Sequence, residues 1–159
     1  MKSNIEINYV QKRRKKVVVF KILVLITTIW FCFMTYLSHQ NGEETTELSK
    51  GIVERIIEYF QIGNYNEIHS IIRKLAHPFV FCILAVLVLL TLYQRWKNRK
   101  VFIVAIVLMI LWAWIDEFTK LSIPGRHFSW CDVSLNLAGV VAGVLIFTLF
   151  NYFRMKKKK

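Results

Sequence analysis

The sequence predicts an all-α integral membrane protein, a four-helix bundle with a short extracytoplasmic amphipathic helix. Three observations lead to this class: four long apolar runs, basic residues beside alternate ends of those runs, and few helix-breaking residues. The chain has 159 residues, 55% of them hydrophobic, with two prolines and six glycines. A soluble domain of this length does not normally need apolar runs of nearly twenty residues.

The four apolar runs predict the membrane spans. A helix needs roughly 20 apolar residues to cross a bilayer core of about 30 Å. The first, second and fourth runs meet that length, whereas the third is short unless it continues through Asp116 and Glu117 to Leu121. That extension brings two acids to the membrane boundary. The runs are Val17–Leu37, Leu75–Tyr93, Val101–Ile115 and Val133–Phe153.

The distribution of lysine and arginine predicts the orientation. Fifteen of the 22 basic residues lie in the N-terminal tail, in Gln94–Lys100 or after the last run, which is one side of a chain crossing four times. Nine of the ten acids lie on the other side. Since basic loops stay in the cytoplasm, we expect a multi-pass protein with both termini cytoplasmic. The net charge of +12 sits beside the apolar runs without a nucleic-acid-binding motif, so we expect no nucleic-acid partner.

The chain divides into four parts. Residues 1–38 form a cytoplasmic basic tail and the first span, and residues 39–72 an extracytoplasmic loop. Residues 73–153 form a three-helix membrane core, and 154–159 a basic cytoplasmic tail. Within the loop, apolar residues recur at helical spacing over Leu48–Phe60, which predicts an amphipathic helix. A further helix is expected to begin near Asn64 or Asn66, with one of them as its cap, and to run into the second span.

Polar residues gather at the outer ends of the last three spans, and the first span is not expected to contribute. Pro78 is placed in an early turn of the second span, where it costs little. Gly139 and Gly143 form a G-x-x-x-G pattern that allows close helix approach. Ionisable groups facing lipid near the membrane centre cost about 2.5–3.5 kcal/mol each, so they should face one another. We therefore expect an outward-facing pocket lined by Arg73, Lys74, His77, Asp116, Glu117, Arg126, His127, Asp132 and Asn136.

A purely structural interpretation of this cluster stays open, because an ion-pair network can hold helix ends together. His77, Glu117, His127 and Asp132 could in principle bind a metal, but no H-E-x-x-H or comparable spacing occurs. We expect no metal and no cofactor. The three cysteines form no C-x-x-C pair and read as packing residues, with Cys131 set apart by its neighbour Asp132.

Three segments together resemble the signature of VanZ-like membrane proteins. They are Arg73-Lys-Leu-Ala-His77, then Asp116-Glu117, and then Gly125-Arg126 followed by Asp132-Val-x-x-Asn136-x-x-Gly139-x-x-x-Gly143. The resemblance covers about Arg73 to Gly143. This chain departs from the family at Val80, where an acid is usual, and at Lys120, where glutamine is usual. The resemblance implies a role in the bacterial cell envelope, and one family member is associated with low-level resistance to the glycopeptide teicoplanin.

Three functions fit these observations. In the first, the protein is a non-catalytic factor that binds or shields a lipid-linked wall precursor, with Arg73, Lys74 and Arg126 holding phosphate or pyrophosphate. Alternatively it is a membrane-embedded acid–base enzyme, with His77, Glu117 and Asp132 as catalytic candidates. A proton or solute pathway is the third, although four helices without inverted repeats make a poor transporter. Expected partners are membrane lipids and a polyprenyl-phosphate-linked precursor or a glycopeptide.

Overall fold

The computed structural model describes residues 2–40, 50–51, 53–55, 57–59 and 65–157. Its elements are the long helices α1 (Lys2–Ser38), α3 (Tyr65–Arg95), α4 (Arg99–Thr119) and α5 (Trp130–Lys156), and the short 3-10 helix η1 (Lys120–Ser122). Each long helix is long and apolar enough to cross a membrane. Within these residues no strand is found. The all-α prediction is confirmed, and the chain is a multi-pass membrane protein with four candidate spans.

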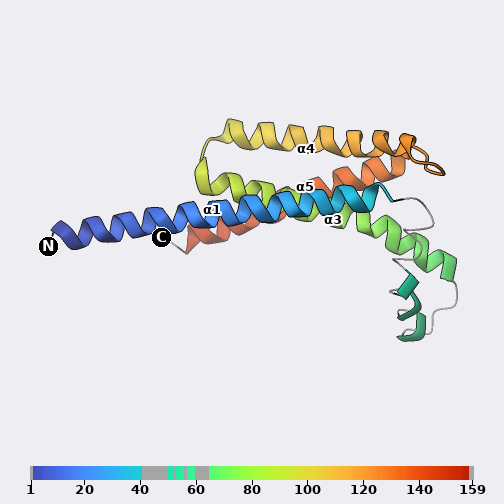
Figure 1. Ribbon diagram of the computed structural model, residues 1–159, viewed down its shortest axis with the longest axis horizontal. Helices are drawn as coiled ribbons and strands as arrows, with labels where there is room; N and C mark the ends of the chain where they lie inside the picture. Colours follow the sequence, from blue (N-terminus) through green and yellow to red (C-terminus); the bar gives the residue numbers. More distant parts are fainter. Residues whose placement is uncertain (1, 41–49, 52, 56, 60–64, 158–159) are drawn as a thin grey trace.

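Successive long helices run in opposite directions, so both termini lie at one end of the bundle (Figure 1). We call this the terminal end; it also holds the connection between α3 and α4. The opposite end, where α1 finishes and α5 begins, is called the cavity end. The N-terminal part of α1 projects beyond the other helices at the terminal end (Figure 1).

Two helices extend further than their apolar runs. α4 and η1 continue through Asp116 and Glu117 to Ser122, which confirms the longer of the two expectations for the third span. The sequence places Pro78 in an early turn. α3 begins at Tyr65, however, so Pro78 lies in the interior of the helix. A proline there removes one backbone hydrogen bond. Asn66 lies inside α3 and therefore does not cap it, and Asn64 lies outside the described residues.

Short polar residues fix where α4 and α5 begin. The Asn98 side chain accepts a hydrogen bond from the backbone N–H of Lys100 at 2.9 Å. The Ser129 hydroxyl accepts one from the backbone N–H of Asp132 at 3.2 Å. Such N-caps satisfy donors that a helix start leaves without partners. The cap on α5 sets the rotation at which Asp132 and the following residues meet the bundle.

The two glycines of α5 bring this helix into direct contact with α3. A Cβ built on Gly139 would lie 2.3 Å from the carbonyl oxygen of Pro78, and one on Gly143 would lie 2.6 Å from that of Cys82. α3 and α5 are the most extensively packed pair of helices. The predicted close approach along the G-x-x-x-G face is therefore confirmed. Around it lies a core formed by Met34, Phe81, Leu84, Ala85, Leu89, Met109, Ala113, Val140 and Phe147.

The residues described between positions 50 and 59 are helical. Val53 is buried and Ile57 half-buried, whereas Glu54, Arg55 and Glu58 are exposed. The two faces agree with the predicted amphipathic helix over the part of Leu48–Phe60 that is described. The remaining positions of that segment lie outside the described residues.

Candidate functional site

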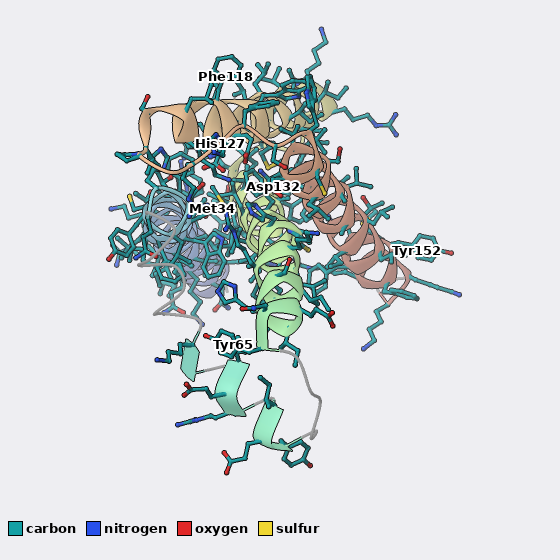
Figure 2. All side chains as sticks on the ribbon, turned by 90° about the vertical axis from the view of Figure 1, so that its right-hand side faces the viewer. Met34, Tyr65, Phe118, His127, Asp132 and Tyr152 are labelled. Atoms are coloured by element: carbon teal, nitrogen blue, oxygen red, sulfur yellow. The ribbon has the colours of Figure 1, made fainter. Side chains whose placement is uncertain are left out.

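A cavity of about 260 Å³ opens at the cavity end of the bundle. Figure 2 looks onto this end, with Met34 on α1 to one side and Asp132 at the start of α5 to the other. The wall is largely apolar and carries several charged groups. Its apolar residues are Met34, Leu37, Ile72, Ala76, Val80 and Phe81, and its polar residues are Ser38, Gln40, Arg73, His77, Asp116, Lys120 and Arg126.

A tight turn places Arg126 in this wall. The backbone N–H of Arg126 donates to the carbonyl oxygen of Ile123 at 3.1 Å, and Gly125 between them has a φ of 75°. Proline second and glycine third, with a positive φ at the glycine, are the features of a type II turn. The Pro124-Gly125 pair thus determines the direction of the chain at this point. It reverses the chain after η1 so that the arginine side chain folds back under the end of α1.

Arg126 is buried and holds the end of α1. Its Nε and Nη2 donate to the carbonyl oxygen of Gln40 at 3.1 and 2.7 Å. A guanidinium suits this position because the carboxyl end of a helix carries a partial negative charge. Burial, and next the positive charge of Arg73, lower the pKa of Arg126 below its ordinary value, while nearby carboxylates raise it. The group stays protonated, since arginine keeps its proton in proteins.

Arg73 reaches the same cavity from α3. It is half-buried, and its positive charge is close enough to act on Arg126. Among the described residues no carboxylate forms a salt bridge with it. Two guanidinium groups therefore line one cavity, and the carboxylates near Arg126 offset part of their repulsion.

Lys120 is the centre of a buried ionic cluster with two acids. Its Nζ donates to Glu117 Oε2 at 2.5 Å and lies 3.7 Å from Asp116 Oδ2. All three residues are at most 1% exposed. The other oxygen of Glu117 accepts the backbone N–H of Ser129 at 3.2 Å, and Asp116 Oδ2 accepts the Ser38 hydroxyl at 2.8 Å. The cluster thus joins the end of α4 to both α1 and the start of α5.

His77 connects the cavity wall to α5. Its Nδ1 lies 3.0 Å from Asn136 Oδ1, and its Nε2 lies 3.7 Å from Asp132 Oδ2. An oxygen atom therefore faces each ring nitrogen. Asn136 is fully buried and Asp132 half-buried. α5 itself contributes no residue to the cavity wall. It supports the wall from behind through these two side chains.

The nine residues predicted for the pocket take three different positions. Arg73, His77, Asp116 and Arg126 line the cavity. Glu117, Asp132 and Asn136 lie behind that wall and bond to residues in it. Lys74 and His127 are exposed and are not among the residues that line it. Within the described part of the chain, no three side chains of His, Cys, Asp or Glu converge as metal ligands would.

The first span does contribute to the site, contrary to the expectation from sequence. α1 supplies Met34, Leu37 and Ser38 to the wall, and Gln40 follows directly after it. Lys120 also lines the cavity, although the sequence marks it only as a position where the chain departs from the family pattern. The signal for Lys120 was its spacing from Asp116 and Glu117. Ser38 and Gln40 offered none, because they are ordinary polar residues at the end of an apolar run.

Comparison with known proteins identifies the family. A search of curated proteins and a search of solved structures gave no match. A family model described as VanZ/LLP1 matches residues 22–151, which takes in the second half of α1, all of α3 and α4, and most of α5. Since this match covers most of the chain, the protein belongs to the VanZ/LLP1 family.

Proposed function

We propose that this protein binds the phosphate or pyrophosphate group of a lipid-linked cell-wall precursor in its cavity. The observation that carries the proposal is the meeting of Arg73 and Arg126 in one largely apolar wall. Guanidinium groups bind phosphate oxygens through paired, charge-assisted hydrogen bonds. The apolar residues beside them suit the first carbons of a lipid chain. Bound in this way, a precursor is shielded from a glycopeptide such as teicoplanin, and this shielding is the proposed route to resistance.

The proposal requires the cavity to face outward from a bacterial plasma membrane. The basic residues support this orientation, because the two tails and the loop between α3 and α4 all lie at the terminal end (Figure 1). Basic segments of this kind remain in the cytoplasm during membrane insertion. Both termini are then cytoplasmic, and the cavity end meets the outer leaflet, where lipid-linked precursors are used.

Replacing Arg73 with glutamine tests the proposal. We expect Arg73→Gln to weaken binding of polyprenyl diphosphate by roughly tenfold or more, since a charge-assisted hydrogen bond is lost. The measurement is lipid binding to the purified protein by native mass spectrometry. Lys74→Gln is the matched control, because Lys74 carries the same charge one residue away but is exposed and does not line the cavity. If both variants weaken lipid binding equally, the cause is the general surface charge and not the cavity, and the proposal is contradicted.

The same pair of variants connects binding to resistance. A deletion strain carrying Arg73→Gln should be as sensitive to teicoplanin as the strain without the gene, whereas Lys74→Gln should restore the parental inhibitory concentration. If neither the deletion nor the variants change teicoplanin susceptibility, the resistance part of the proposal fails even where binding stands.

An acid–base enzyme is the second candidate, and the position of His77 favours it. This histidine lines the cavity with a carboxylate, Asp132, 3.7 Å from its Nε2. Histidine paired with a carboxylate is a common general acid or base. Against this role, both ring nitrogens face side chains of α5. A proton exchange with a substrate in the cavity has to break one of these contacts.

His77→Gln separates the two candidates. Glutamine can still hydrogen-bond to Asn136 but cannot transfer a proton near neutral pH. For a binding protein we expect lipid affinity and drug susceptibility to change by less than about threefold, well below the effect of Arg73→Gln. Complete loss of cellular function with unchanged lipid affinity would instead indicate an enzyme.

A further inference from the structure

One carboxylate oxygen in the cavity wall has no hydrogen-bond partner. Asp116 is 1% exposed, and its Oδ2 accepts the Ser38 hydroxyl and faces Lys120. Its Oδ1 is equally buried, yet no donor among the described residues reaches it. A buried acceptor without a donor is expensive, and native structures rarely keep one without a reason.

Glu117, the other acid of the cluster, has a partner for each of its oxygens. One oxygen of Glu117 accepts Lys120 Nζ, and the other accepts the backbone N–H of Ser129. Both residues belong to the same helix end and share the same lysine. Only Asp116 borders the cavity, and only Asp116 has an unused oxygen. Because Asp116 lines the cavity, a ligand bound there is the nearest candidate to supply the missing donor.

The charges around the cavity are already balanced. Three cations, Arg73, Lys120 and Arg126, accompany three carboxylates, Asp116, Glu117 and Asp132. Among the described residues these charges are equal in number, so a bare phosphate bound by the arginines leaves the site with an excess of negative charge. A ligand that brings its own donor or its own positive charge avoids this cost, because buried charges are tolerated only when paired.

We propose that the ligand carries a hydrogen-bond donor close to its phosphate, and that Asp116 Oδ1 accepts this donor. The inference rests on the proposed function, since Arg73 and Arg126 hold the phosphate. Asp116, Arg73 and Arg126 line the same cavity of about 260 Å³, so the donor and the phosphate belong to one headgroup. An ammonium or a hydroxyl meets the requirement. The first occurs in an ethanolamine phospholipid, and the second in the first sugar of a lipid-linked wall precursor.

Two matched pairs of lipids test the inference on the unaltered protein. Phosphatidylethanolamine and phosphatidylcholine share a phosphate and a positive charge, but the methylated amine has no N–H to donate. Polyprenyl diphosphate with and without its attached sugar form the second pair. By native mass spectrometry, we expect the donor-bearing member of at least one pair to bind roughly tenfold more tightly. The pair that shows the preference identifies the source of the donor.

Asp116→Asn should remove that preference. Because the Ser38 hydroxyl donates to Oδ2 and the Lys120 ammonium faces the same oxygen, the amide nitrogen of asparagine takes the position of Oδ1, where it cannot accept. The ratio of affinities within the preferred pair should then fall to about one. Thr119→Ala is the control, since the Thr119 hydroxyl donates to the backbone oxygen of Asp116 at 2.8 Å and leaves the carboxylate untouched. That variant should keep the full preference.

The outcomes separate this inference from the proposed function. If phosphate lipids bind through Arg73 but both pairs bind equally, the donor site is overturned and the phosphate site stands. A preference that survives Asp116→Asn also overturns it. If no phosphate lipid binds, the proposed function fails, and the donor site fails with it. Should Asp116→Asn not fold, the comparison of the lipid pairs on the unaltered protein still decides the question.

Discussion

Gly139→Ala is expected to be among the most damaging single substitutions in this protein, although it adds only one methyl group. The new Cβ would lie 2.3 Å from the Pro78 carbonyl oxygen and 2.8 Å from its Cα. These are backbone atoms and cannot rotate away, so α3 and α5 have to separate. Overpacking of this kind costs up to about 3 kcal/mol in the free energy of unfolding.

The same substitution should also disrupt the site. Asn136 lies three residues before Gly139 on α5, and its bond to His77 requires α5 to stay close to α3. Thermal unfolding in mild detergent gives the stability, and lipid binding gives the effect on the cavity. Ala142→Val is the control, because Ala142 is exposed on the same helix. Gly139→Ala with unchanged stability would contradict the described packing of the two helices.

Replacement of Lys120 is expected to be comparably severe, for an electrostatic reason. Lys120→Met keeps most of the side-chain volume but leaves Asp116 and Glu117 buried without a cation. Breaking a buried ion pair by removing one partner typically costs about 3–5 kcal/mol. We therefore expect a large fall in the unfolding temperature and little folded protein at neutral pH.

Two further variants show whether charge is the cause. Lys120→Gln restores a donor for Glu117 without the charge, so its stability should fall between those of the native protein and Lys120→Met. A triple variant, Asp116→Asn with Glu117→Gln and Lys120→Met, removes every charge and should recover most of the lost stability. If the triple variant is no more stable than Lys120→Met alone, packing of the lysine chain is responsible and not its charge.

The fold could be predicted from the sequence because membrane spans depend on local composition. Run length and the positions of basic residues identified four helices, and the acids at the end of the third run correctly indicated its extension to Ser122. The expected helix that runs into the second span from near Asn64 or Asn66 is α3, and Pro78 was misplaced because its position was counted from the start of the apolar run and not from the start of this helix. In a membrane protein, the hydropathy pattern marks the bilayer and not the end of a helix.

The site was predicted in part, and its errors have geometric reasons. Successive residues of a helix point about 100° apart, and α3 turns Ile72 and Arg73 toward the cavity, so of Arg73 and Lys74 only Arg73 lines it. The sequence could not tell which one does. Gln40 could not be found at all, since it acts through its backbone carbonyl, which any residue provides. The charged residues were found because charge near a bilayer is itself a signal.

The position of α1 in the cavity wall bears on how the protein is made. The ribosome delivers α1 before its packing partner α3, and α1 buries far fewer of its residues than the other three helices do. The surface against which α3 packs most closely is made last, because it is formed by the glycines of α5. A chain arrested before α5 thus has both arginines but not the Asn136 that holds His77 in the wall. His77 is therefore held in the cavity wall only after α5 has been made.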